Sequence, residues 1–281
     1  MSGQAVAGAG GQGAGGPAGA AQAAADATAA FRLDGRTALV TGAGRGLGAD
    51  IALTLAGAGA HLVLLSRSEA ELAEVAGRIE RAHGDRPDIL VCDLTDAPHA
   101  QACIEALPAL DILVNNAGTN RPQAFVDVGL DALDALLALN LRAAFAAAQA
   151  AARRMLRDPD RARRGGAIVN MSSQMGHVGS GGRSVYCLTK HGIEGLTKAA
   201  AVELAPHGIT VSTVCPTFAR TPMTQAFFQD KAFSDWVHDR IPRGRLVTTQ
   251  EVAQAVLYLV SPAAAMVTGS ALLLDGGWTA Q

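Results

Sequence analysis

Short apolar segments recur along the chain from residue 37 onward, and each is followed by a longer amphipathic segment. The amphipathic segments carry apolar residues at helical spacing, as Leu47, Ile51 and Leu55 do after the first apolar segment. Strands that alternate with helices predict an α/β domain: one doubly wound, parallel, seven-stranded sheet with helices on both faces. The predicted strands are Thr37–Val40, His61–Leu65, Asp88–Cys92, Asp111–Val114, a strand from Ala167 that ends in Ser172 and Ser173, Gly208–Pro216 and Ala271–Gly277.

The first thirty residues differ in composition from the rest of the chain. Residues 1–30 are rich in glycine and alanine, and Val6 is the only large apolar residue after the initial methionine. Such a segment buries too little surface to offset its ordering entropy, so we expect a disordered extension. It has neither a basic start nor a continuous apolar core, so it is not expected to be a signal peptide. The folded part is expected to be one domain, residues 31–281.

Composition restricts the possible partners. The chain has 281 residues, 49% of them hydrophobic, and a formal net charge of −2, which gives no electrostatic reason to bind nucleic acid or an acidic membrane surface. No later segment is expected to be long and apolar enough to span a membrane. The four cysteines are scattered without a C-x-x-C pair, which favours neither a disulfide framework nor a zinc site and fits a cytoplasmic protein.

The candidate chemistry centres on the stretch after Ala167. A predicted helix carries Tyr186 and Lys190 four residues apart, so that both project from one face. An unperturbed tyrosine ionises near pH ~10, and a nearby ammonium favours the phenolate, which makes the tyrosine a better acid–base group. Ser173 precedes Tyr186 by thirteen residues at a predicted strand end. Its hydroxyl could bind the same substrate oxygen that Tyr186 protonates.

A glycine-rich turn between the first strand and its helix indicates a phosphate site. In TGAGRGLG, Gly42 permits a tight turn, Gly46 lets the backbone approach a pyrophosphate, and Gly48 allows close packing of helix on strand. The helix N-terminus adds N–H groups and the positive end of the helix dipole.

These motifs together resemble the short-chain dehydrogenase/reductase family, and the resemblance covers residues 31–281. Its marks are Tyr-x-x-x-Lys with the preceding serine, the spacing Thr-Gly-x-x-x-Gly-x-Gly, and the tetrapeptide Asn115-Asn116-Ala117-Gly118. The resemblance implies a Rossmann-like fold and an NAD(P)-dependent oxidoreductase. It also implies that Asn140, Ser173, Tyr186 and Lys190 are catalytic, with Asn140 holding a water against the lysine in a proton path from solvent.

The same resemblance assigns residues to the cofactor. The Asp93 carboxylate is expected to accept a hydrogen bond from the adenine amino group, Asn116 to Gly118 to flank the adenosine ribose, and Thr221 to bind the nicotinamide carboxamide. Thr217 departs from the family, which usually has glycine after this proline. The expected cofactor contacts are Gly42, Arg45, Gly46, Leu47, Gly48, Ser66, Arg67, Asp93, Leu94, Asn116, Ala117, Gly118, Tyr186, Lys190, Pro216 and Thr221.

The end of the second strand favours NADP over NAD. An acidic residue there binds the ribose hydroxyls of NAD, whereas a basic one accommodates the 2′-phosphate of NADP. This chain has Ser66 followed by Arg67, and Arg45 lies in the glycine turn. We therefore predict NADP, with NAD as an alternative; Arg67 could instead pair with Glu71.

The substrate is less closely defined by the sequence. The resemblance implies reversible hydride transfer to a ketone or from a secondary alcohol, with a sugar, sugar acid or polyol favoured and a 3-oxoacyl-thioester reductase as the alternative. A cofactor-sensing regulatory protein without turnover is a remote third reading. Residues 222–245 are expected to form a substrate lid, whose aromatic residues could instead be subunit contacts. The family further implies a homodimer or homotetramer.

Two histidine pairings are expected to carry no chemistry. His191 and Glu194 share a helix face, but without a third ligand they are read as an exposed pair, so no metal site is predicted. His177 near Ser173 suggests a hydrolase, yet the chain has no G-x-S-x-G elbow, and His177 is read as a pocket-lining residue.

Overall fold

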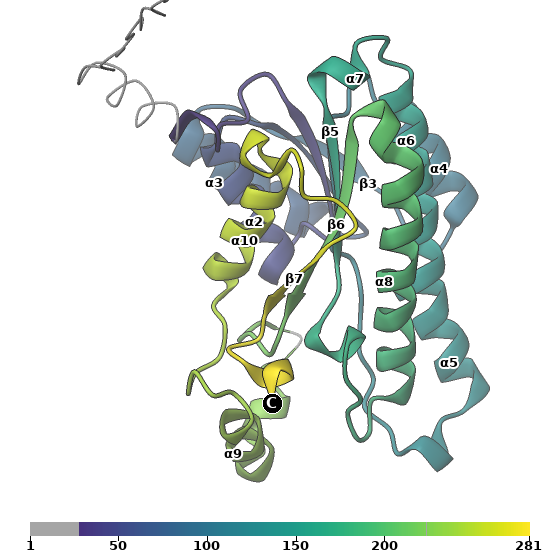
Figure 1. Cartoon of the computed structure of the whole chain (residues 1–281), viewed down its shortest axis with the longest axis vertical. Helices are drawn as coiled ribbons and strands as arrows, with labels where there is room; N and C mark the ends of the chain where they lie inside the picture. Colours follow the sequence, from purple (N-terminus) through teal and green to yellow (C-terminus); the bar gives the residue numbers. More distant parts are fainter. Residues whose placement is uncertain (1–27, 223) are drawn as a thin grey trace, which may run out of the picture.

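The computed structural model describes residues 28–222 and 224–281. Seven strands form one parallel sheet in the order β3-β2-β1-β4-β5-β6-β7, which confirms the predicted Rossmann-like fold (Figure 1). The chain starts in the middle of the sheet and crosses over between β3 and β4. The strands are β1 (Thr37–Thr41), β2 (His61–Ser66), β3 (Asp88–Val91), β4 (Ile112–Asn115), β5 (Gly166–Met171), β6 (Ile209–Pro216) and β7 (Ala271–Leu274).

Helices cover both faces of the sheet and separate two apolar cores. Helices α2, α3 and α10 pack on one face and α4, α6 and α8 on the other (Figure 1). The α-helices are α2 (Gly46–Gly57), α3 (Glu69–His83), α4 (Ala97–Glu105), α5 (Leu130–Leu137), α6 (Ala144–Leu156), α7 (Arg161–Arg164), α8 (Ser184–Leu204), α9 (Lys231–Asp239) and α10 (Thr249–Val260). The 3₁₀ turns are Phe125–Asp127, Gln174–Gly176, Ala205–His207, Phe227–Gln229, Pro262–Ala264 and Trp278–Ala280.

The helix stretch Leu130–Leu156 corrects one sequence expectation. By length and composition this stretch could cross a membrane, contrary to the prediction that no segment could. More than half of its most apolar window is buried inside the protein, and it packs against α4. It therefore has the features of a core helix, which passes the same test.

The segment before β5 is anchored rather than an exposed loop. It contains helix α7, and the Arg161 guanidinium is buried 2.8 Å from the Asp111 carboxylate and donates to the Leu110 carbonyl. Burial alone would raise the pKa of Asp111, but the hydrogen bond from the Thr37 N–H and the pair with Arg161 hold that pKa below its usual value. This cluster holds the first residues of β1 and β4 in place. It lies at the amino edge of the sheet, opposite the carboxyl edge that carries the sequence motifs.

The predicted lid packs on the body of the domain through aromatic rings. Phe218, two residues after the end of β6, contacts Phe228 and Phe233 in edge-to-face geometry with ring centres 6.0 and 5.5 Å apart. The Trp236 ring centre lies 5.5 Å from that of Trp278. These rings therefore contact one another within the chain. Position 223 of the predicted lid lies outside the described residues.

Most of the predicted N-terminal extension also lies outside the described residues, which begin at Thr28. The last residue of that predicted segment, Ala30, accepts a hydrogen bond from the Ala263 N–H at 3.1 Å. Residues just before the predicted boundary at Phe31 therefore contact the domain.

Candidate active site

The polar motifs meet at the carboxyl edge of the sheet. The glycine turn follows β1, the Asn-Asn-Ala-Gly segment follows β4, Ser173 follows β5, and Pro216 ends β6. Because all strands are parallel, these segments lie at one edge, where ligands of open α/β sheets bind. Asp93 follows β3 at the same edge.

The glycine turn has the shape of a phosphate cradle. Gly42 and Gly46 have φ angles of +64° and +56°, which side-chain-bearing residues rarely adopt. A Cβ on Gly48 would overlap the Gly42 carbonyl oxygen and lie 2.7 Å from the Asn116 amide nitrogen. The first turn of α2 contains no acidic residue, and its N-cap, Arg45, makes no side-chain capping bond. The free N–H groups of that turn therefore fit an anionic cofactor phosphate.

The predicted turn residue Leu47 and the loop residue Thr221 have different surroundings. The Leu47 side chain is partly buried and packs against the core on the α2 face. Across the turn, the Thr221 Cβ would lie 3.7 Å from a Cβ on Gly46. Thr221 is thus adjacent to the glycine turn. This position is compatible with its predicted role as a cofactor contact.

The Asn-Asn-Ala-Gly segment ties β4 to its neighbours. The Asn116 amide donates to the Thr41 carbonyl at 2.9 Å, and the Ala117 N–H donates to the Thr41 hydroxyl at 3.0 Å. The Asn115 amide donates to the Ala144 carbonyl at 2.7 Å. The Asn116 amide therefore ties the end of β4 to the end of β1, and the Asn115 amide ties it to α6. Gly118 leaves room beside Asn140, whose Oδ1 would lie 3.3 Å from a Cβ there.

Asn140 sits in a π-helical segment, Ala138–Ala143, between α5 and α6, and is 2% exposed. Its Oδ1 accepts from the Thr119 N–H and its Nδ2 donates to the Thr119 carbonyl, both at 2.8 Å. A π-helical segment is a local distortion of the helix, and such segments are frequent at functional sites. The side chain itself holds the loop after β4.

Ser173, Tyr186 and Lys190 come together beyond the end of β5. Tyr186 is half-buried and Lys190 is buried one turn later on α8. The Ser173 hydroxyl donates to the Gln174 Oε1 at 2.6 Å, and the Ser173 side chain lies close enough to the Tyr186 phenol to favour its ionised form. The Lys190 Nζ lies 5.5 Å from the centre of the Tyr186 ring and donates to the Met171 carbonyl at 2.7 Å. The three predicted groups therefore form one cluster.

The pKa values within this cluster differ from the sequence expectation for Tyr186. Burial raises the pKa of Tyr186 to about 12, whereas the Ser173 hydrogen bond and the Arg183 charge act in the opposite direction. Burial also lowers the pKa of Lys190 to about 8, against the influence of Cys215 and Glu194. The expected net lowering of the Tyr186 pKa by Lys190 is therefore absent in this arrangement, because desolvation dominates.

The predicted adenosine end is lined by exposed ion pairs. Arg45 lies 3.2 Å from Glu71, and Arg67 lies 3.8 Å from Asp93. Arg67 thus pairs with Asp93, and it is Arg45 that pairs with Glu71. Hydrogen bonds from the Thr95 backbone and side chain hold the pKa of Asp93 below its usual value. Ser66 and Leu94, the other two residues predicted to contact the cofactor here, contribute less polar surface. The Ser66 hydroxyl forms hydrogen bonds within its own turn, and Leu94 is buried.

Comparison with known proteins agrees with this geometry. Residues 42–279 match the family described as enoyl-(acyl carrier protein) reductase. An L-xylulose reductase of Bos taurus is 39% identical over 251 residues, which is 89% of this chain and 98% of that protein. The chain belongs to the short-chain dehydrogenase/reductase family. It is accordingly an NAD(P)-dependent oxidoreductase that acts on alcohol and ketone groups.

Two further short-chain dehydrogenases/reductases illustrate the range of relatives. A gluconate 5-dehydrogenase from Burkholderia cenocepacia, solved in complex with NADP and tartrate, superimposes with a TM-score of 0.85 at 37% identity, covering 91% of this chain and 99% of the other. A 3-oxoacyl-[acyl-carrier-protein] reductase of Vibrio harveyi is 35% identical over 87% of this chain and 98% of its own length.

Thr217, where this chain departs from the usual short-chain dehydrogenase/reductase pattern, fits the local backbone. Its N–H donates to the Leu274 carbonyl at 3.1 Å, and its side chain is buried. Its hydroxyl has no hydrogen-bond partner among the described residues. Pro216, directly before it, completes β6 and pairs in register with Leu274.

A buried acidic cluster beside Lys190 was not predicted. Glu194 is buried rather than part of an exposed pair with His191, and its carboxylate accepts from the Thr213 hydroxyl at 3.0 Å and the Cys215 thiol at 3.3 Å. The His177 Nε2 lies 3.4 Å from the same carboxylate. Glu194 follows Lys190 by one helical turn, so the helix periodicity placed both on one face. Only the packing of α8 on β6 shows that this face is buried.

Proposed function

We propose that this enzyme transfers hydride reversibly between a nicotinamide cofactor and a carbonyl or secondary alcohol carbon of a hydroxylated substrate, namely a sugar, sugar acid or polyol. The observation that carries the proposal is the cluster of Ser173, Tyr186 and Lys190 next to a glycine turn that fits cofactor phosphates. The substrate class is supported by relatives that are named as L-xylulose reductase and gluconate 5-dehydrogenase.

Each residue of the cluster has a distinct role in this proposal. When bound, the nicotinamide supplies or accepts the hydride. Ser173 and Tyr186 hydrogen-bond the substrate oxygen, and Tyr186 donates its proton during reduction. Lys190 lies close enough to the phenol to stabilise the phenolate that forms. Asn140 positions the loop after β4 and supports the water that returns the proton.

The proposed cofactor is NADP, with the adenine end held by Asp93, Leu94 and the Asn116–Gly118 segment. Arg45 and Arg67 are proposed to bind the 2′-phosphate, and both are mostly exposed in weak surface ion pairs. A phosphate can therefore displace Glu71 and Asp93 from them at low cost. The complex of the gluconate 5-dehydrogenase with NADP also supports this choice.

The proposal is tested by following the reduced-nicotinamide absorbance and fluorescence bands. NADPH and NADH are titrated separately, and turnover is then measured with ketoses, with sugar acids and polyols plus oxidised cofactor, and with a 3-oxoacyl thioester. We expect tighter binding of NADPH and turnover of the hydroxylated substrates. Turnover of the thioester alone would instead identify a 3-oxoacyl-thioester reductase. The similarity to acyl-carrier-protein reductases supports that alternative. Cofactor binding without any turnover would favour a sensing protein instead.

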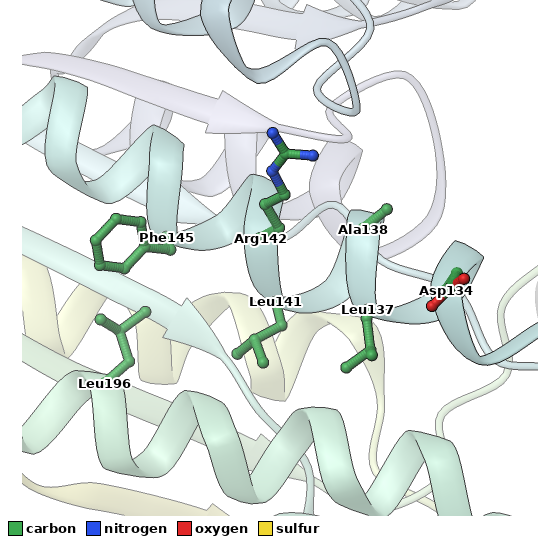
Figure 2. A pocket seen from close by; sticks show the side chains of 7 residues that line it. All are labelled: Asp134, Leu137, Ala138, Leu141, Arg142, Phe145 and Leu196. Carbon is green, nitrogen blue, oxygen red and sulfur yellow. The ribbon is translucent and has the colours of Figure 1, made fainter. Parts of the chain in front are cut away.

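The enzyme is proposed to form a homodimer or homotetramer through the outer faces of α5, α6 and α8. Leu137 and Leu141 point toward α8, and Leu196 points back from it, so that they line a pocket on the protein surface (Figure 2). Phe145 also lines this pocket and is 48% exposed, so apolar surface of α6 lies outside the core. An exposed apolar patch of this kind is typical of a subunit interface.

Sedimentation velocity at micromolar concentration checks this assembly. The wild-type enzyme is expected to sediment as a dimer or tetramer, and Phe145→Glu is expected to shift it toward the monomer because a carboxylate would be buried in the interface. Val91→Glu is the matched control, since Val91 is also an exposed apolar residue but lies on the edge strand β3. A monomeric wild-type protein would contradict the proposal.

A cytoplasmic location is also proposed. All four cysteines lie within the described residues and are free, which fits a reducing compartment.

A further inference from the structure

We propose that Arg183 is a carboxylate-binding residue of the active site, so that the preferred substrate is a sugar acid rather than a neutral sugar or polyol. This inference rests on the proposed function, because it concerns the substrate that reacts at Tyr186. It goes further in assigning one residue to the recognition of one chemical group.

Arg183 is a buried cation without a counter-ion. Its side chain is 6% exposed, its Nη1 has no hydrogen-bond partner, and no carboxylate of residues 28–222 or 224–281 forms an ion pair with it. Burial lowers the pKa of Arg183, which reflects the loss of solvation. An unpaired buried charge is costly, so such a residue is normally paired with an anion.

The other buried arginine in the described part of the chain shows what a structural role looks like. Arg161 is 5% exposed, and its guanidinium binds Asp111 and Asp158 as well as backbone carbonyls. The Arg161 guanidinium is thus fully paired with protein carboxylates and carbonyls, whereas Arg183 retains an unused hydrogen-bond donor that a ligand can bind.

Arg183 lies close to the proposed proton donor, Tyr186. It is the N-cap of α8 and precedes Tyr186 by three residues, and its charge acts on the Tyr186 phenol. Its guanidinium carbon is 4.7 Å from the centre of the Phe227 ring and 5.9 Å from that of Phe233, both in the predicted lid. Arg183 therefore lies between the proton donor and the lid, and its guanidinium group contacts two aromatic rings of the lid.

Two further unpartnered polar groups lie at the same carboxyl edge of the sheet. Gln174 is 1% exposed, and its Oε1 accepts from the Ser173 hydroxyl at 2.6 Å while its Nε2 has no partner. The buried Oδ1 of Asn120, in the loop after the Asn-Asn-Ala-Gly segment, also has no partner. Together with Arg183, these groups give two donors and one acceptor at the edge of the sheet that carries Tyr186, which suits a molecule with a carboxylate and several hydroxyls. A planar guanidinium binds a carboxylate through two parallel hydrogen bonds.

Kinetics with matched substrates test this assignment. Aldonates and alditols of four to six carbons differ only in a terminal carboxylate against a CH₂OH group. We expect the wild-type enzyme to prefer the aldonates, and Arg183→Met to reduce kcat/KM for aldonates by at least about tenfold, with alditols changed by less than about threefold. Arg183→Lys should retain part of the preference, because it keeps the charge but loses the bidentate geometry.

Arg220→Met is the matched control. Arg220 also stacks on a lid ring, with its guanidinium carbon 5.8 Å from the centre of Phe228, but it is exposed to solvent. Its replacement should leave the aldonate preference unchanged. Thermal melting of each variant shows whether it is folded.

A binding measurement keeps the test independent of turnover. The only two tryptophans of the chain, Trp236 and Trp278, lie in the lid cluster, so their fluorescence reports ligands near Arg183. D-Gluconate should change this fluorescence in the wild type and in Arg220→Met but not in Arg183→Met, and D-glucitol should bind more weakly throughout.

The possible outcomes separate the two proposals. Turnover of alditols in preference to aldonates would overturn the role of Arg183 and leave the proposed function intact. An equal loss for both substrate classes in Arg183→Met, with a shifted pH–rate profile, would also overturn it, since Arg183 would then act on the Tyr186 pKa. Gluconate binding that depends on Arg183 without any turnover would support the subsite and count against hydride transfer.

Discussion

Replacing Tyr186 with phenylalanine is expected to reduce kcat by about 10²- to 10⁴-fold, the range typical of a lost general acid. The variant keeps the ring and removes only the hydroxyl, which lies beside Ser173. The cofactor site should remain intact, because the glycine turn and the Asn-Asn-Ala-Gly segment make their contacts elsewhere. Steady-state kinetics and a parallel NADPH titration measure both effects.

The control for this variant is the other tyrosine of the chain. Tyr258 lies in α10, with its ring centre 6.4 Å from that of Phe31, on the α2 face of the sheet. Tyr258→Phe should retain wild-type kcat. If Tyr186→Phe kept more than about a tenth of wild-type kcat, proton donation would have to be assigned to another group.

Gly48→Ala is expected to weaken NADPH binding by at least about tenfold and to lower stability by about 1–3 kcal/mol. The new Cβ would overlap the Gly42 carbonyl oxygen and crowd the Asn116 amide, so the turn that presents the phosphate-binding N–H groups must shift. Fluorescence titration with NADPH and thermal denaturation of the apoenzyme measure the two effects separately.

Gly77→Ala is the matched control for the glycine turn. Gly77 lies within α3, and the only neighbour of an added Cβ is the flexible end of Arg81, at 3.2 Å. Alanine is favoured over glycine inside a helix by about 0.5–1 kcal/mol, so this variant should be as stable as wild type or slightly more so. Unchanged NADPH affinity in Gly48→Ala would mean that the turn does not bind the cofactor phosphates.

The sequence predicted the sheet because each buried parallel strand has a local signal. The strand at Thr37–Val40 and the glycine turn after it can each be recognised from residues adjacent in the sequence. The structure contains both at the predicted positions. The same holds for Tyr186 and Lys190, whose spacing alone puts them on one face of α8.

The features that the sequence did not predict depend on contacts between distant segments. Asp111 and Arg161 pair across fifty residues, and neither position has a periodicity that indicates the other. The burial of Arg183 requires the lid to cover it, and the burial of Glu194 requires α8 to pack on β6. The raised pKa of Tyr186 likewise follows from desolvation, which the spacing of charged residues does not reveal.

The distribution of unsatisfied polar atoms implies a conflict between stability and activity at one end of the sheet. Within the described residues, the buried side-chain atoms without partners belong to Asn120, Ser172, Gln174, Arg183 and Thr217, and all five residues follow strands at the carboxyl edge or begin α8. The opposite edge carries the satisfied Asp111–Arg161 cluster. Replacing these residues with apolar residues of similar shape would remove buried polar atoms that lack partners, and so would stabilise the fold. The same replacements would remove the groups on which substrate selection depends. Stabilising substitutions that preserve activity should therefore be sought at the opposite edge and on the outer helices.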